Sequence, residues 1–89
     1  MIKEMKWIEF IDQFTKRNSG FIERLDKAHP ALTRTQFKVC LYLYSGYSSK
    51  DIAEQLNLTK QSVENHRYRL RKIFQLNKIQ NLMTYLLRI

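Results

Sequence analysis

Residues Ser48–Phe74, SSKDIAEQLNLTKQSVENHRYRLRKIF, decide the fold of this chain. Their apolar side chains recur at three- and four-residue intervals, which predicts helices rather than strands. Ser48 or Ser49 can cap a first short helix, and Thr59 can cap a second helix over about 60–75, because hydroxyl side chains accept hydrogen bonds from free amides at helix starts. The segment therefore predicts two helices joined by a tight turn.

The second of these helices has one apolar and one polar side. At 100° per residue, Leu70 and Phe74 fall within about 20° of Val63, so these three side chains form a buried stripe. The side chains opposite this stripe are Gln61, Asn65, Tyr68 and Lys72, flanked by Glu64 and Arg71 on one side and by Ser62 and Arg69 on the other. The helix is therefore expected to pack its back on a core and to present a polar front.

The chemistry of this polar front suits a groove of DNA. Asn and Gln can bond both N6 and N7 of adenine, and Glu can accept a hydrogen bond from N4 of cytosine. The candidate base-reading residues are Gln61, Glu64, Asn65 and Tyr68. Hydroxyl and basic side chains bind phosphates without reading sequence. The candidate phosphate contacts are Thr59, Lys60, Ser62, Arg69, Arg71 and Lys72. The alternative is an amphipathic helix with an ordinary solvated face.

The charge of the chain supports a polyanionic partner. The 89 residues carry a formal net charge of +8. Residues 1–30 hold six Lys/Arg and five Asp/Glu, a net of +1, whereas residues 31–89 hold ten and three, a net of +7. A basic half joined to a nearly neutral half is typical of a domain that binds nucleic acid through one part. A solvated basic surface is the alternative explanation.

The remaining sequence predicts further helices and no strand. Trp7, Phe10, Ile11 and Phe14 form one apolar stripe on a helix over about 3–18. Gly20 is expected to end this helix in a left-handed conformation. The other expected helices run over about 21–27, from Thr33 to Gly46 with Phe37, Cys40, Leu41 and Tyr44 buried, over about 49–57 with Ile52, Ala53 and Leu56 buried, and over about 78–87. Thr33 and Gln36 are spaced as a capping box.

The pattern predicts an all-α fold: a small helical bundle with a helix-turn-helix. Residues 1–30 are expected to form an N-terminal helical extension or linker, and residues 31–89 the helix-turn-helix domain. On the helix over 60–75, His66 is expected to be partly buried, and Arg67 is expected to pair with an acid of a neighbouring helix. Both lie at the margin of the apolar stripe.

Little in the sequence suggests chemistry other than binding. The single cysteine, Cys40, lies in an apolar run and is expected in the core. The two histidines, His29 and His66, belong to no Cys/His cluster, so no metal and no cofactor are expected. No nucleophile–base pair or phosphate-binding loop indicates an enzyme. The absence of a membrane span or signal-peptide pattern predicts a cytoplasmic location.

Residues 32–87 resemble the LuxR/GerE-type helix-turn-helix domain of bacterial regulators. The matching residues are Leu32-Thr33, Val39, Leu43, Gly46-x-Ser48, Lys50-Asp51-Ile52-Ala53, Leu56, Leu58-Thr59, Ser62-Val63, His66 and Leu70. The chain departs from the family at Thr35-Gln36, where Arg-Glu is usual, and at Glu64 and Ile73, where Lys is usual. The resemblance maps the family's base-reading positions onto Glu64, Asn65 and Tyr68.

The resemblance implies binding of double-stranded DNA in transcription regulation, with the helix over 60–75 in the major groove. It also implies a homodimer formed through the last helix, with Ile79, Leu82, Met83, Leu86 and Ile89 as candidates. The alternative role of these residues is in the chain's own core, and both roles are expected, with the inner face of the last helix packed on the helix over 60–75. Segments such as HPALT and NLMTYLLRI resemble the C-terminal domains of larger sensor-regulators of the Bacteroidetes type. On that basis the chain is expected to be a C-terminal fragment that follows a signalling helix.

Two other functional hypotheses remain open. One is a protein-interaction or adaptor module that keeps the helix-turn-helix fold without binding DNA. Glu64 on the polar front and the apolar stripe of Trp7, Phe10 and Phe14, available to a partner helix, would support it. The other is a fragment resembling region 4 of a sigma factor, which also predicts DNA contact.

Overall fold

Six helices make up the described part of the chain, which is the backbone of residues 2–89 and the side chains of residues 6–89 in a computed structural model. They are α1 (Ile2–Arg17), α2 (Ser19–Ala28), α3 (Arg34–Tyr44), α4 (Ser49–Leu56), α5 (Lys60–Ile73) and α6 (Leu82–Arg88). No strand occurs between residues 2 and 89, and the predicted all-α class is confirmed.

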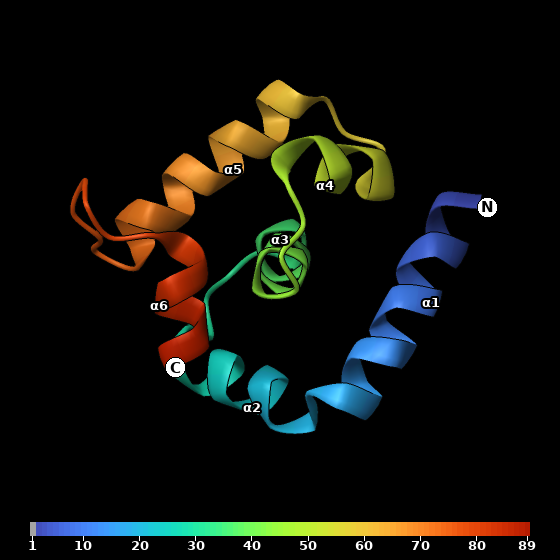
Figure 1. Cartoon of the computed structure of the whole chain (residues 1–89), viewed down its shortest axis with the longest axis horizontal. Helices are drawn as coiled ribbons and strands as arrows, with labels where there is room; N and C mark the ends of the chain where they lie inside the picture. Colours follow the sequence, from blue (N-terminus) through green and yellow to red (C-terminus); the bar gives the residue numbers. More distant parts are fainter. Residues whose placement is uncertain (1) are drawn as a thin grey trace.

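Helix α3 lies at the centre of the molecule. Figure 1 shows it end-on, inside a ring formed by α1, α2, α6, α5 and α4 in that order, and contacts between α1 and α4 close the ring. A helix that is surrounded in this way must be apolar on more than one face. The prediction of one buried face was therefore too narrow, because Val39, Tyr42 and Leu43 are buried as well. Of the predicted residues, Phe37 and Tyr44 are only half-buried. The fully covered residues are Val39, Cys40, Leu41, Tyr42 and Leu43.

Aromatic rings attach α1 to this central helix. The ring of Phe10 stacks on that of Tyr42 with centroids 4.0 Å apart, and Trp7 lies 6.0 Å from the same Tyr42 ring. Phe14 packs edge-on against Phe21 and Tyr44 at 5.9 and 5.8 Å. The aromatic stripe of α1 thus packs mainly on α3, with Phe14 buried and Trp7 and Phe10 half-buried, rather than standing free for a partner helix.

Local capping signals were predicted correctly at α3. The Gln36 amide donates to Thr33 Oγ1 at 3.1 Å, and the Thr33 amide donates to Gln36 Oε1 at 3.0 Å, which completes the capping box. At the other end, Gly46 has φ +89°, a conformation in which a residue with a Cβ would be strained. The start and the end of α3 were therefore both predictable from residues at its own termini.

Gly20, in contrast, was assigned the wrong role. It lies inside α2, which begins at Ser19, and it has no left-handed conformation. The break between α1 and α2 is made by Asn18 alone, with φ −135° and ψ 48°. A single non-helical residue suffices here because Phe14 and Phe21, on either side of the bend, meet in the same core.

The last helix begins later than predicted, at Leu82 rather than near Lys78. Asn77 Oδ1 accepts hydrogen bonds from the amides of Ile79 and Gln80 at 2.9 and 3.0 Å, which holds this segment in a turn. Asn81 then caps α6 by accepting from the Thr84 amide at 3.1 Å. Ile79 consequently lies in a loop with 92% of its surface exposed.

Candidate nucleic-acid interface

Helices α4 and α5 form the predicted helix-turn-helix, and their own polar side chains define its geometry. Ser48 caps α4 by accepting from the Asp51 amide at 3.1 Å, and Thr59 caps α5 by accepting from the Ser62 amide at 3.0 Å. Between them Asn57 takes the left-handed conformation, φ 55° and ψ 47°, which Asn tolerates better than most residues. The turn is therefore short and fixed at both ends.

The back of α5 is anchored in the core, as the helical wheel predicts. Val63 and Leu70 are fully buried and Phe74, which ends the helix, is 6% exposed. On α4, Ile52 and Ala53 are buried, while Leu56 is half-buried. Because both helices are held from behind, the outward side of α5 has a defined orientation relative to the rest of the molecule.

The outward side of α5 is polar and exposed. Two side-chain contacts, each between residues four apart, partly order it. Gln61 Nε2 donates to Asn65 Oδ1 at 3.1 Å. Lys72 Nζ lies 4.7 Å from the centroid of the Tyr68 ring, and Tyr68 is 60% exposed. Side chains at i and i+4 of a helix meet on one face, so each pair restricts the rotamers that its members adopt.

Glu64 is the single acid of α5, beside five basic residues on the same helix. Its side chain is exposed. Among the side chains of residues 6–89 the ion pair found is Lys16–Asp12, so no Lys or Arg neutralises the Glu64 carboxylate. Both carboxylate oxygens remain available to accept hydrogen bonds from outside the chain.

The basic residues among the predicted phosphate contacts divide into two groups. Lys60, Arg69 and Lys72 are exposed on α5. Arg71 is half-buried, and its guanidinium donates to the carbonyl oxygen of Gln80 at 2.7 Å and to that of Asn77. Arg71 thus holds the loop between α5 and α6, a role that the sequence analysis missed. The Asn-rich segment from residue 77 to 81 was the available signal for a structured turn.

Comparison with protein families identifies this arrangement. A family model described as bacterial regulatory proteins, luxR family, matches residues 30–86. The chain belongs to the luxR family. The predicted family resemblance is therefore confirmed, and DNA binding in transcription regulation is the function at the family level. Comparison with curated proteins and with solved structures gives no match.

The luxR-type match begins just before α3 and ends within α6, so α1 and α2 lie outside it. Domains of this family are DNA-binding regulatory modules rather than enzymes. Lys50, at the start of α4, is exposed and was not among the predicted contacts.

His66 and Arg67 lie at the edge of the luxR-type core, as the helical wheel predicts, and both are half-buried. The pKa of His66 lies below its ordinary value of 6.5, because burial disfavours the charged ring and Arg69 adds to this effect. Its Nδ1 atom is buried without a hydrogen-bond partner. Arg67 has no acid within ion-pair distance among residues 6–89, so its predicted pairing is wrong.

The last helix of the luxR-type domain contributes to the core as well as to the surface. Leu82 and Leu86, two of the residues predicted at a dimer interface, are 3% and 1% exposed and pack inside the chain. Met83 and Leu87 are exposed on the outer face of α6. Leu82 and Leu86 thus form the inner face of α6 that was expected to pack within the chain.

Other sequence expectations concern the chemistry of the whole chain. Cys40 is fully buried, as expected, and burial raises the pKa of its thiol to about 12, so the thiol stays protonated near neutral pH. Residues 6–89 contain no group of three or more His, Cys, Asp or Glu side chains that could hold a metal ion. No helix within residues 2–89 has the length and apolarity to cross a membrane.

Proposed function

We propose that this luxR-type domain binds specific DNA sequences, with α5 in the major groove and α4 across the backbone. The observation that supports this is the outer side of α5. It is exposed, polar and partly ordered, on a helix whose back is fixed by fully buried Val63 and Leu70. A rigid helix with hydrogen-bonding groups in a fixed array suits recognition of base edges.

Gln61, Glu64, Asn65 and Tyr68 are the proposed base-reading residues. Because Gln61 donates to Asn65 Oδ1, Gln61 Oε1 and Asn65 Nδ2 remain free. Together these two atoms can accept from N6 of adenine and donate to N7, so the pair favours an adenine. Glu64, unpaired within the chain, favours a cytosine N4 donor nearby, and Tyr68 favours a thymine methyl group or a phosphate oxygen.

The proposed phosphate contacts act without regard to sequence. They are Thr59, Lys60, Ser62, Arg69, Arg71 and Lys72, with Lys50 of α4 as an addition. Three exposed cations of α5, Lys60, Arg69 and Lys72, predict that the logarithm of the binding constant falls with the logarithm of salt with a slope of about −3 per domain. Arg71 contributes less, since two carbonyl oxygens already occupy its guanidinium.

We further propose that the domain acts as a homodimer through the outer face of α6. Met83 and Leu87 would meet the partner, with Ile79 at the edge, while Leu82 and Leu86 support the helix from within. Residues 1–30 would form an extension and residues 31–89 the DNA-binding domain. A cytoplasmic location follows from this proposal, because chromosomal DNA is the ligand.

Selection of bound sequences from a random DNA pool tests the proposal, with two matched variants. Asn65→Ala should cost about 1–3 kcal/mol and relax specificity at one base pair. Lys72→Ala should weaken binding about equally for all sequences and reduce the salt slope by about 1. Enrichment of no sequence by the unaltered chain, or binding that the double variant Asn65→Ala/Tyr68→Ala leaves unchanged, would rule out the groove assignment.

A second candidate function is a protein-interaction module without DNA binding. The unpaired Glu64 and the exposed ring of Tyr68 favour it, because an acid on the reading face repels phosphates. Glu64→Gln distinguishes the two functions. On DNA this variant should bind random sequences more tightly and lose preference for cytosine, whereas an adaptor would show no DNA binding before or after the change.

A further inference from the structure

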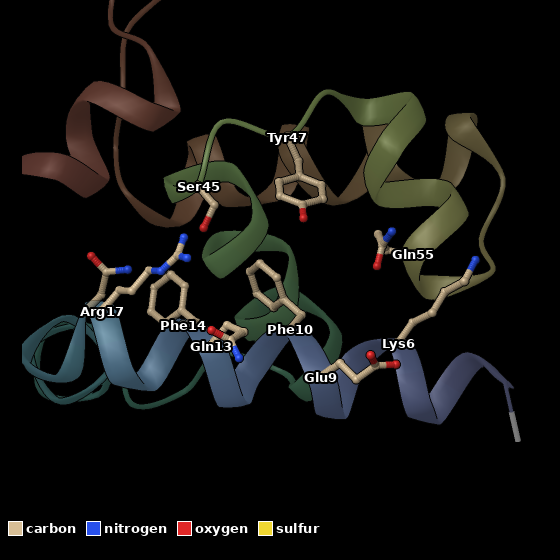
Figure 2. Close-up of a pocket in the computed structure, with 10 residues that line it drawn as sticks. Lys6, Glu9, Phe10, Gln13, Phe14, Arg17, Ser45, Tyr47 and Gln55 are labelled. Atoms are coloured by element: carbon tan, nitrogen blue, oxygen red, sulfur yellow. The ribbon is translucent and has the colours of Figure 1, made fainter.

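A cleft of about 610 Å³ separates α1 from the segment that joins α3 to α4. Its floor is aromatic: Phe10 and Phe14 project from α1, and the ring of Tyr47 faces them from the opposite wall (Figure 2). The volume lies within the range of about 300–1,000 Å³ that small-molecule sites usually have. Phe14 is buried, whereas Phe10 and Tyr47 are half-buried, so a flat apolar group could rest against the accessible parts of Phe10 and Tyr47.

The two ends of the cleft are cationic. Figure 2 shows the Arg17 guanidinium extended toward Ser45 at one end and Lys6 extended toward α4 at the other. Neither cation forms an ion pair with an acid among residues 6–89, although Glu9 also lines the cleft. The next residue to Arg17 behaves differently: Lys16 pairs with Asp12 at 3.2 Å and does not line the cleft.

The two walls come from different parts of the chain. Phe10, Phe14 and Arg17 lie outside the luxR-family match, whereas Tyr47 and Gln55 lie inside it. Gln55 belongs to α4 and points toward α1 in Figure 2. A molecule that touches both walls would join α1 to the helix-turn-helix, so the site couples the unmatched N-terminal part of the chain to the DNA-binding part.

We propose that this cleft binds a small aromatic anion. Phe10 and Tyr47 meet edge-on at 5.7 Å with an angle of 80° between their planes, so the aryl group packs against both rings, with its face on one and its edge on the other. The anionic group accepts hydrogen bonds from the Arg17 guanidinium. A carboxylate and a phosphate share the chemistry that Arg17 recognises, because both offer two oxygens to its planar fork. Binding of this kind does not depend on DNA and extends beyond the function proposed above.

A nuclear magnetic resonance titration of the full chain without DNA tests the site, with phenyl phosphate as the probe. The amide signals of Arg17, Ser45, Tyr47 and Gln55 should shift and saturate at millimolar concentration. Arg17→Gln should weaken binding about tenfold, the loss expected for one charge-assisted hydrogen-bonded contact. Lys16→Gln removes the same charge one residue away, outside the cleft, and should leave binding unchanged. Benzyl alcohol and inorganic phosphate, which each lack one half of the probe, should both bind much more weakly.

Three results would overturn the proposal. One is the absence of shifts in the cleft. Another is a set of shifts centred on the basic side of α5 and reproduced by inorganic phosphate, which would indicate general anion binding. The third is an equal effect of Arg17→Gln and Lys16→Gln. Since no DNA is present, none of these results bears on DNA recognition, so the two proposals fail separately.

Discussion

The two sides of α3 are packed in different ways. On one side, α1 attaches through large rings at half-buried positions, such as Phe10 stacked on Tyr42 at 4.0 Å. On the other side, α5 attaches through Val63 and Leu70, which are smaller and fully buried. Close-packed aliphatic side chains tolerate little displacement, whereas offset rings at a rim leave more freedom. We therefore expect the chain to hold its proposed reading helix more tightly than its N-terminal helix, although α1 also buries Phe14.

This difference coincides with the limit of the luxR-family match, which includes α5 and excludes α1. The tightly packed side is the part that the family pattern describes. On the aromatic side, α1 lies outside the match and packs on residues inside it, and the cleft with the two cationic ends lies along this contact. Substitutions on either side of α3 can therefore separate the stability of the DNA-binding unit from the attachment of α1.

The largest effect is expected at the aliphatic side. Leu70→Ala should lower the free energy of unfolding by about 3 kcal/mol, because it removes a fully buried side chain and leaves a cavity. Thermal unfolding followed by circular dichroism measures this loss. Leu87→Ala, at a leucine that is 56% exposed, is the control and should cost little. Equal losses at the two leucines would contradict the assignment of Leu70 to the core.

A smaller loss is expected at the aromatic side. Phe10→Ala should cost about 2 kcal/mol, since the ring is half-buried but contacts Tyr42 and Tyr47 closely. Trp7, the single tryptophan, reports the attachment of α1 by its fluorescence. Ile8→Ala, at an exposed position of the same helix, is the control.

Two probes of the Phe10→Ala variant sharpen the comparison between the sides. The core is continuous from Phe14 to Leu86, so fluorescence and circular dichroism should give one shared transition in the unaltered chain. In Phe10→Ala the Trp7 signal should change at a lower temperature, while DNA affinity measured in the cold is retained. A parallel loss of DNA affinity would show that α1 and α5 are held equally tightly.

Much of the fold could be predicted because the deciding interactions are local. Thr33 with Gln36, Ser48 with Asp51, and Thr59 with Ser62 each lie three residues apart, and each forms the predicted hydrogen bond. The stripe of α5 follows from helical periodicity alone. The exposure of the proposed base-reading side is fixed by the same periodicity, so it too was accessible from sequence.

The errors concern interactions between segments. Arg71 reaches across the loop to the Gln80 carbonyl, nine residues away, and no periodic pattern indicates such a contact. Residues 78–81 have helical periodicity but do not form a helix, because Asn77 Oδ1 accepts hydrogen bonds from the amides of Ile79 and Gln80. The role of the α1 stripe likewise depended on its partner: the same apolar pattern fits a foreign helix or, as observed, α3.

An intermediate effect is expected at the start of α5. Thr59→Ala removes the cap that accepts from the Ser62 amide and should cost about 1 kcal/mol. Thr15→Ala provides a matched control, because the Thr15 hydroxyl bonds the Ile11 carbonyl within α1 and caps nothing. Denaturant unfolding of both variants measures the difference. A loss at Thr15 as large as that at Thr59 would show that the hydroxyl group, rather than the cap, carries the effect.

The smallest effect is expected from pH. Burial holds the pKa values of His29 and His66 below 6.5, their ordinary value, so both rings bind protons more readily in the unfolded chain. Their contribution to stability is therefore complete above pH 6.5 and is lost as the pH falls through the lowered values. Melting temperatures measured from neutral to mildly acidic pH should decline over this window, and the decline should be modest because both rings keep some contact with water.

The two histidines should not contribute equally to this decline. His29 Nε2 lies 2.6 Å from the hydroxyl of Tyr85, which can accept a hydrogen bond when the imidazole is charged. His66 Nδ1 is buried without a partner, so protonation would place an unsatisfied donor beside the core of α5. His66→Gln should thus flatten the pH dependence more than His29→Gln. Both rings lie near α5, since His29 packs against Phe74 at 4.5 Å, so the comparison isolates the effect of a hydrogen-bond partner. If His29→Gln flattened the pH dependence more, the missing partner of His66 Nδ1 would not determine the cost of protonation.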